Sequence, residues 1–385
     1  MDTIIKYLRL LLLITLSAYT GADIGFFAAH KLPVVDDFFY SRQFPIRGSN
    51  VDNIIIVGID NNTMERFGIL RYKRSVYAEV LAKILEGGPK AIAVDIFFDG
   101  VRDIKDDLRL IKTLNSANGN IVLAIYVNEA EKFLLNHDNI TSKEYFNGNE
   151  LISLGSVYGV VKKSSYGGIT KLLLTPQFDK EGREYYPLPI VALTKYLNAD
   201  FDAYPYGYED NATIGGISIP TFTDKYLDRY MYINYTGGPE AFNLVAFEKV
   251  PQMNPEVFKD KIVLIGTVGD SMSDNHQTPI SKTTPGIVIH ANIIHTIINK
   301  RFISPMGRDY QWLFVFIVMI AAFILFYYAK NKISIPTALV ILVIVKLTID
   351  LMFTHYGIYV QFFPFIVSTW FVSTCAIIFR KSNNC

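Results

Sequence analysis

The chain has 385 residues and a formal net charge of +1, and half of its residues are hydrophobic. The near-neutral balance gives no electrostatic basis for binding nucleic acid. The hydrophobic fraction is high for a soluble protein and is concentrated at the two ends, which predicts a membrane protein. The two cysteines, Cys375 and Cys385, lie at the C-terminal end, so the region before them must fold around an ordinary hydrophobic core without disulfides.

The N-terminal segment has the pattern of a signal anchor. Lys6 and Arg9 precede an apolar run, and we expect a membrane anchor over residues 1–29. Asp23 is unusual for the middle of a span, and Thr20-Gly21-Ala22 is similar to a cleavage site, so a removed signal peptide is the alternative. Under either interpretation the segment that follows is exported.

Strands and helices alternate over the first part of the region that follows. Continuous apolar runs are typical of strands buried on both faces of a sheet, and apolar residues at helical spacing occur between them. Gly87-Gly88-Pro89 is a helix stop. The predicted strands are 53–60, 91–98 and 120–126, and the predicted helices are 75–85 and 108–115. This alternation predicts an α/β fold with a parallel sheet.

Residues 129–235 are richer in Gly, Tyr, Asn, Asp and Pro, and we expect an irregular or antiparallel insertion there. It is interpreted as part of the same domain because the parallel pattern resumes afterwards, with a strand at 261–266 and a helix at 286–300. Within the insertion we expect short strands at 156–160, 170–174 and 230–235, a turn at 179–182 and a helix at 189–197.

The C-terminal part contains three apolar segments, each about the 17 to 25 residues that span a bilayer. They are Trp312 to Ala329, Ile335 to Phe353 and Phe362 to Phe379. Positively charged residues that flank membrane spans favour the cytoplasmic side. A path of four spans places all the basic residues that flank these spans on that side. We therefore expect residues 30–308 outside a bacterial inner membrane, three spans within 309–380, and a short cytoplasmic tail at 381–385.

An ordered set of motifs closely resembles the second type of CHASE domain, an extracellular sensory module found ahead of bacterial adenylate cyclases and kinases. The motifs are Ile54-Ile-Ile-Val-Gly-Ile-Asp60, Lys73-Arg74, Gly88-Pro-Lys-Ala-Ile-Ala-Val-Asp95-Ile-Phe-Phe, Asp179-Lys-Glu-Gly-Arg183, Pro187-Leu188, Ile233-Asn-Tyr-Thr-Gly237, Lys261-Ile-Val-Leu-Ile-Gly266, Asp274, Thr278-Pro279, Pro285-Gly286 and His290-Ala291-Asn292. The resemblance implies a sensor. In many relatives a cyclase or kinase follows the last span, whereas only Arg380 to Cys385 follow here, so signalling would need a partner.

Ligands of open parallel sheets bind at the carboxyl ends of the strands, where the candidate ligand-binding residues lie. These are Asp60, Asp95, Gly266, Thr267 and Asp274. A divalent metal would be held by Asp60, Asp95, Asp274 and His276 if they converge. For Asp60 and Asp95 the sequence favours the simpler role of capping loops and helix starts. A nucleotide role is not supported, because neither the Walker pattern nor the dinucleotide fingerprint is present.

Three further features have ionisable groups. His290 and His295 lie five residues apart on one predicted helix, which favours packing or surface roles over a shared metal. Lys346 and Asp350 share one face of a predicted span and are expected to pair, either as a local neutralising pair or as a switch or docking contact to a partner's helix. No nucleophile elbow is found, so we expect no enzyme.

The sequence therefore predicts a membrane-anchored sensor that binds an unknown ligand or partner and signals through its spans to a separate output protein. Two other classes stay open: an exported metal-dependent hydrolase, and an envelope assembly or scaffold subunit. The expected partners are the lipid bilayer and a separate signalling or envelope protein, with a homo-oligomer as a further option. No nucleic acid is expected.

Overall fold

The computed structural model describes residues 2–32, 39–40, 43–44, 51–67, 73–96, 98, 103–125, 127–128, 133–134, 157–160, 163–165, 169–178, 184–203, 211–223, 228–269, 274–328 and 334–383. The chain forms two compact units. Residues 44–302 make up one unit, and residues 1–43 together with 303–385 make up the other.

The unit of residues 44–302 is built on a six-stranded sheet in which every neighbouring pair of strands is parallel. Its order is β16 (Phe242–Ala246), β1 (Val51–Ile59), β17 (Ile262–Thr267), β2 (Ala91–Val94), β3 (Ile121–Ile125) and β6 (Val157–Val160). The order in space differs from the order in sequence because β17 inserts between β1 and β2. The predicted α/β class with a parallel sheet is confirmed.

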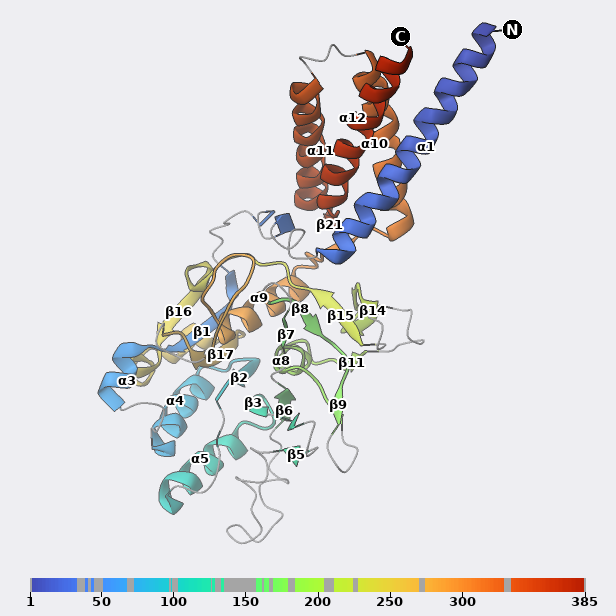
Figure 1. Ribbon diagram of the computed structural model, residues 1–385. Helices are drawn as coiled ribbons and strands as arrows, with labels where there is room; N and C mark the ends of the chain where they lie inside the picture. The colour runs from blue at the N-terminus through green and yellow to red at the C-terminus, as the bar shows by residue number, and fades with distance from the viewer. Residues whose placement is uncertain are drawn as a thin grey trace. The chain divides into compact units, whose positions relative to one another are not determined.

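Helices cover both faces of this sheet, as Figure 1 shows. On one face lie α4 (Arg74–Glu86) and α5 (Ile104–Ser116), which pack on alternate strand residues such as Val57, Val263 and Ile92. On the other face lie α8 (Leu188–Leu197) over β2, β3 and β6, and α9 (Gly286–Ile298) over β17 and β1. Burial on both faces explains why the strands are continuous apolar runs.

The helix ends follow from local sequence. Asp103 caps α5 by accepting from the backbone N–H groups of Lys105 and Asp106, each at 3.0 Å. After α4 the chain turns at Gly88, whose φ of +68° favours glycine. The short helix α3 (Asn61–Phe67) follows β1, and the 3₁₀ turns η2 (Pro239–Ala241), η3 (Phe247–Gln252) and η4 (Pro255–Phe258) surround β16.

The predicted insertion contributes to the main sheet as well as forming its own antiparallel sheets. One antiparallel sheet has the order β14, β15, β8 and β7, and another has the order β11, β12 and β13. Their bounds are β7 (Lys163–Ser165), β8 (Ile169–Leu173), β11 (Phe201–Asp202), β12 (Ala212–Ile214), β13 (Ile217–Ile219), β14 (Phe222–Thr223) and β15 (Arg229–Tyr232). However, β6 extends the parallel sheet and α8 packs on that sheet, so parts of the insertion belong to the core of the main domain.

Shorter strand pairs complete this unit. They are β4 (Val127–Asn128) with β5 (Phe133–Leu134), β9 (Gln177–Phe178) with β10 (Glu184–Tyr185), and β18 (Asn275–His276) with β19 (Thr284–Pro285). The turn predicted at residues 179–182 lies outside the described residues. The strand predicted over 91–98 ends as β2 at Val94, and β16 was not predicted at all.

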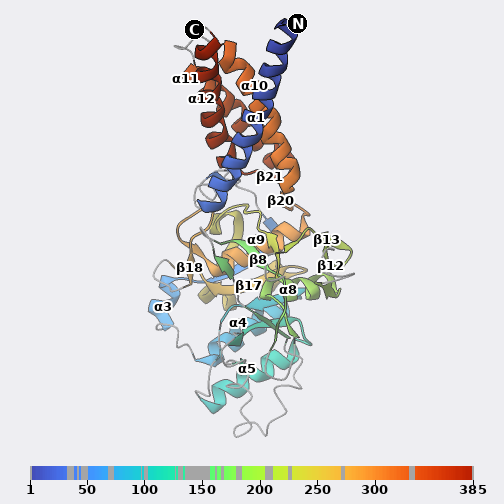
Figure 2. The ribbon, with the colours of Figure 1, turned by 45° about the vertical axis from the view of Figure 1, so that its right-hand side comes forward.

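The second unit is a bundle of four helices, shown side by side in Figures 1 and 2. They are α1 (Asp2–Lys31), α10 (Arg308–Tyr328), α11 (Ser334–Tyr356) and α12 (Phe363–Asn383). All four are long and apolar enough to cross a membrane. A two-stranded parallel pair, β20 (Ser304–Pro305) with β21 (Ile358–Tyr359), lies at the end of the bundle opposite the two termini.

Candidate functional site

The carboxyl edge of the parallel sheet gathers the residues that the sequence singled out. β1 and β17 end side by side, with Ile59 opposite Thr267. Asp60 follows β1 directly, and Asp95 follows β2, where its backbone N–H donates to the carbonyl of Ile265 at 2.8 Å. These positions therefore lie at the ends of three adjacent strands, as the topology of a parallel sheet requires.

Asp60 caps helix α3. Its Oδ1 atom accepts from the backbone N–H of Thr63 at 2.8 Å and from the Thr63 hydroxyl at 2.7 Å. This is the hydrogen bonding of an N-cap, which satisfies a free backbone donor in the first turn. The capping interpretation accounts for the position of this carboxylate.

Gly266 permits close packing between a strand and a helix. A Cβ atom at this position would lie 2.9 Å from Cβ of Ile287, closer than real Cβ contacts allow. Glycine thus lets α9 approach β17, and packing explains this residue without a ligand. Thr267, the next residue, is half-buried at the end of the strand.

Asp274 and His276 form a pair at the start of α9. The Oδ1 atom of Asp274 and the Nε2 atom of His276 are 2.7 Å apart, and both side chains are about a third exposed. The backbone carbonyl of Asp274 accepts from the N–H of Gly286 at 2.9 Å. Because Gly286 is the first residue of α9, this loop fixes where that helix begins.

Asp95 and His290 form a second pair, which is deeply buried. The Oδ2 atom of Asp95 and the Nε2 atom of His290 are 3.5 Å apart, and the side chains are 5% and 2% exposed. Neither ring nitrogen of His290 has a hydrogen-bond partner within the described part of the chain. The sequence predicted only a packing or surface role for this histidine.

The four predicted metal ligands do not gather in one place. Asp274 contacts His276, whereas Asp60 caps α3 and Asp95 faces His290. Among the residues that the structure describes, no three side chains of His, Cys, Asp or Glu come close enough to hold a metal ion. Each observed pair offers two donors, fewer than the three or four protein ligands of a zinc site.

The segment Asn234–Gly237, which we call the NYTG segment, is fixed to α9 by buried hydrogen bonds. The backbone N–H of Thr236 donates to Oδ1 of Asn292 at 2.7 Å, and Nδ2 of Asn292 donates to the carbonyl of Gly237 at 3.0 Å. The Thr296 hydroxyl accepts from the N–H of Asn234 at 3.1 Å. The NYTG segment and α9 therefore form one hydrogen-bonded body.

His295 completes this contact from the same helix. Its Nδ1 atom lies 2.9 Å from the hydroxyl of Thr236. Burial, reinforced by the positive charge of Arg301, lowers the pKa of His295 to about 4, so the ring is neutral near pH 7. Burial also raises the pKa of the Tyr235 phenol well above its usual value. The contact between α9 and the NYTG segment is therefore uncharged.

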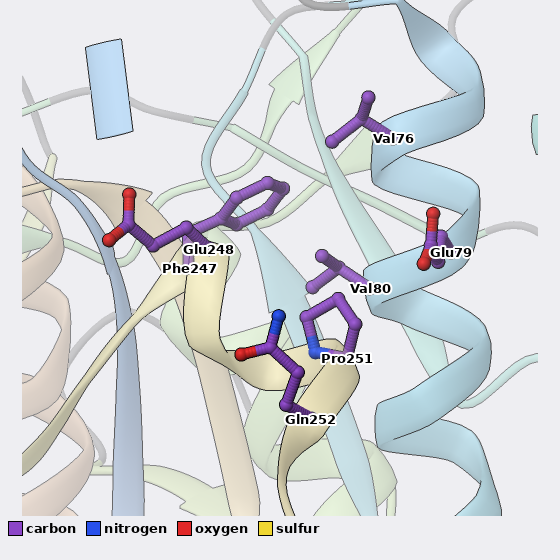
Figure 3. Close-up of a pocket in the computed structure, with 7 residues that line it drawn as sticks. All are labelled: Val76, Glu79, Val80, Phe247, Glu248, Pro251 and Gln252. Carbon is purple, nitrogen blue, oxygen red and sulfur yellow. The ribbon is translucent and has the colours of Figure 1, made fainter. Parts of the chain in front are cut away.

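A small cavity lies between α4 and η3, on the α4 side of the sheet. Figure 3 shows Val76 and Val80 reaching from α4 toward Phe247 and Pro251 of η3. Its volume is about 230 Å³, and Glu79, Glu248 and Gln252 also line it. Ligand pockets usually enclose about 300 to 1,000 Å³, so this cavity suits at most a very small molecule.

In the membrane unit, the segment after α9 is hydrogen-bonded to the connector between the last two helices. The N–H of Ser304 donates to the carbonyl of Gly357, and the N–H of Met306 donates to that of Tyr359, each at 2.8 Å. Buried Gln311 adds a bond from its side chain to the carbonyl of Gln361 at 3.1 Å. The entry to α10 and the α11–α12 connector are thus one structural element.

Polar groups within the bundle have local partners. Oδ1 of Asp23 accepts from the indole N–H of Trp312 at 2.9 Å, which explains how α1 carries a carboxylate within an apolar segment. Lys346 donates to Asp350 on the same face of α11, as predicted. The pair neutralises itself within one helix, so the local interpretation of this pair accounts for both side chains.

The comparison with protein families decides the assignment. The family described as CHASE2 domain matches the chain over residues 10–327, which is most of its length. The chain belongs to the CHASE2 domain family. CHASE2 domains are sensory domains, so the predicted resemblance is confirmed. No curated protein and no solved structure shows significant similarity to the chain.

Two of the CHASE2 motifs contact each other in the structure. The Ile233-Asn-Tyr-Thr-Gly237 motif is the NYTG segment, and the His290-Ala291-Asn292 motif supplies Asn292, which holds it. The two motifs therefore work as one contact, although they are far apart in sequence. Sequence reasoning identified both motifs but not their pairing, because spacing along a chain does not show which segments meet.

A signal that sequence reasoning overlooked is the Gly21-x-x-x-Gly25 spacing in α1. A Cβ atom at Gly25 would lie 2.6 Å from the carbonyl oxygen of Pro364, and the Ser368 hydroxyl donates to the carbonyl of Gly21 at 2.7 Å. Small residues at this spacing allow membrane helices to pack closely. In this CHASE2 protein, α1 is packed against α12 through these glycines.

Proposed function

We propose that the protein is a sensor in the bacterial inner membrane, with residues 44–302 outside the cytoplasm and both termini inside. Binding of a ligand or partner at the carboxyl edge of the sheet shifts α9, and the shift passes through residues 299–307 into the membrane helices. A separate protein receives the signal there. A ligand can drive this change only by binding the two positions of α9 with different affinities.

The arrangement of the bundle supports this orientation. Figure 1 shows both termini at one end of the bundle. The basic residues Lys6, Arg9, Arg380 and Lys381 belong to that end, and positive charge marks the cytoplasmic side of membrane proteins. The chain leaves α1 for the sensory domain, and returns to α10, at the opposite end of the bundle. The tight packing of α1 on α12 also favours an anchor that stays attached over a removed signal peptide.

The observation that carries the proposed mechanism is the β20–β21 pairing. Because Met306 and Ser304 are hydrogen-bonded to the connector of α11 and α12, a pull on this segment acts on three helices rather than on α10 alone. Only residues 299–303 separate α9 from β20. A short, hydrogen-bonded connection transmits small displacements better than a flexible linker does.

The test uses a spin label at Tyr356→Cys, an exposed position at the end of α11, in a chain whose native cysteines are replaced by serine. Asn292→Ala, which loosens the hold of α9 on the NYTG segment, should alter the spectrum of the label. Met306→Pro removes the N–H that bonds Tyr359 and should abolish this response, whereas Met306→Ala keeps the N–H and should preserve it. A response that survives Met306→Pro, or that never occurs, contradicts the mechanism.

The sequence left two alternatives: a metal-dependent hydrolase, for which the four predicted ligands do not come together in the structure, and an envelope scaffold. Metal analysis of the purified chain separates the first, since a hydrolase of that kind retains its ion at a stoichiometric level. A scaffold would give a stable complex with neighbouring envelope proteins and no change at the label when small molecules are added.

A further inference from the structure

Buried His290 is unusual because its two ring nitrogens lack hydrogen bonds within the described part of the protein. A neutral imidazole has one donor and one acceptor, and leaving a buried polar group unpaired costs about 1 to 3 kcal/mol. Native structures contain few such groups, and each calls for an explanation, of which a functional role is one. The His290 side chain is only 2% exposed, so it is shielded from bulk solvent.

The position of His290 follows from the period of two along a strand. In β2, Ile92 and Val94 pack in the core beneath α4 and α5, so Ala93 and Asp95 point to the opposite face. That face is covered by α8 and α9, and α9 brings His290 to within 3.5 Å of the Asp95 carboxylate.

We propose that His290 and Asp95 form a proton-binding site that couples the pH outside the membrane to the position of α9. In the structure the ring lies near Asp95 without a hydrogen bond to it. When the ring takes up a proton, both nitrogens become donors and Nε2–H faces a carboxylate. The resulting charge-assisted hydrogen bond is typically about 2.7 to 2.9 Å long, so its formation draws α9 toward the end of β2 by several tenths of an ångström.

Other ionisable groups lie around α9 in the described part of the chain. β17, β19 and the described part of β1 near α9 contribute no ionisable side chain, and Asp52 is exposed at the far end of β1. On α8, the Tyr196 ring packs against Lys90, which precedes β2, and Lys195 is the residue before Tyr196. Among the residues that the structure describes, the remaining groups are Asp60, which caps α3, Tyr235, Asp274, His276 and, on α9 itself, His295 and the following Arg301. Of these, Asp274 and His276 already bind each other, and His295 faces Thr236.

Movement of α9 carries the NYTG segment with it, because Asn292, His295 and Thr296 hold that segment. The helix then leads through residues 299–303 to β20. The proposal rests on the proposed function in one respect, since an external domain meets the pH of its surroundings. In this proposal, the hydrogen ion is a stimulus that is detected at the carboxyl edge of the parallel sheet.

The experiment measures amide hydrogen exchange of residues 286–298 in the full chain, reconstituted in lipid nanodiscs. All variants carry His295→Gln, which removes the other histidine of α9 while keeping a polar partner for Thr236. Exchange is compared at about pH 7.5 and about pH 5.5, which bracket the usual titration of imidazole, after correction for the intrinsic effect of pH. The protection of these amides against exchange should rise about fivefold at the lower pH, which is a small change relative to the total stability of a protein.

Three further variants decide the outcome. His290→Gln should abolish the rise in protection, and Asp95→Asn should abolish or reverse it, because the protonated ring then lacks its anion. His276→Gln, which removes a histidine outside the buried pair, should leave the rise intact. No rise in the starting protein, or a rise that persists in His290→Gln or Asp95→Asn, overturns the proposal.

The outcome of this experiment can be told apart from the outcome of the test of the proposed function. Exchange in α9 responds to the proton whether or not the signal reaches the spans, and it does not depend on which side of the membrane the domain lies. Failure of the spin-label response at Tyr356→Cys together with a rise in α9 protection would therefore contradict the transmission path and leave the proton site standing.

Discussion

The contact between Asn292 and the NYTG segment gives the sharpest prediction. Asn292 is fully buried, and its amide bonds both the N–H of Thr236 and the carbonyl of Gly237. Asn292→Ala leaves these two backbone groups without their partner in a site that is closed to water. At about 1 to 3 kcal/mol for each unpaired group, the local free energy of opening should fall by roughly 2 to 6 kcal/mol.

That change is large relative to a total stability of about 5 to 15 kcal/mol. Because 1.4 kcal/mol is about a factor of ten, the amides of residues 234–237 and 286–298 should exchange at least about thirtyfold faster in Asn292→Ala. Amide hydrogen exchange of the full chain measures this directly. The Thr236–His295 and Asn234–Thr296 bonds remain in this variant, so the effect should lie toward the smaller end of this range.

Asn299→Ala is a matched control on the same helix. Its side chain is exposed and bonds only the carbonyl of His295, at 3.0 Å, among the contacts that the structure describes. An exposed side chain of this kind should change exchange by less than about threefold. Equal effects of the two alanine substitutions would refute the reasoning, because they would mean that burial and double hydrogen bonding do not set the strength of the contact.

Four further predictions follow from other contacts. Asp107→Ala removes the carboxylate that lies 2.9 Å from the guanidinium of Arg74, a side chain that is only 5% exposed. The free energy of unfolding, measured by urea-dependent pulse proteolysis, should fall by about 3 to 5 kcal/mol. Replacing both residues with apolar ones should restore most of this loss. The pKa of His295 is about 4 in the folded chain, below the usual value of about 6.5. The contribution of this residue to stability is therefore complete above about pH 6.5 and declines by up to about 3 kcal/mol as the pH falls toward 4. In His295→Gln, a measurement of the unfolding midpoint against pH should show little of this decline. Gly25→Leu should separate α1 from α12 and lower the melting temperature of the detergent-solubilised chain, since overpacking costs about 1 to 3 kcal/mol; an unchanged melting temperature would argue against the observed packing. Lys346→Leu leaves a carboxylate unpaired within a span, at a cost of about 2.5 to 3.5 kcal/mol, and should reduce membrane insertion, while replacing both members of the pair should not.

The core strands of the sheet were predictable because their chemistry is local. β1, β17 and β3 are continuous apolar runs, which is what burial between two helical layers requires. In contrast, β16 has the sequence Phe-Asn-Leu-Val-Ala with exposed Asn243 and Leu244, because it lies at the edge of the sheet. An edge strand of five residues does not give a continuous apolar pattern, so it was missed.

The pairing of distant residues was not predictable from spacing. Asp95 was identified from its place at the end of a strand, but its neighbour His290 depends on the packing of α9 across the sheet. Likewise β6 was expected as a strand, and only the assembled sheet shows that it pairs with β3. Gly21 and Gly25 are a different case, because their spacing is a recognisable signal for the packing of membrane helices. That signal was overlooked because Thr20-Gly21-Ala22 is similar to a cleavage site.

The central claim is that the CHASE2 domain lies outside the cytoplasm while both termini remain inside. Labelling of single cysteines in intact cells tests it most directly, in a chain whose native cysteines are replaced by serine. Ser218→Cys, at an exposed position of β13, should react with a membrane-impermeant maleimide, whereas Ser382→Cys should react only after the membrane is permeabilised. Protection of position 218 together with labelling of position 382 in intact cells would contradict the account.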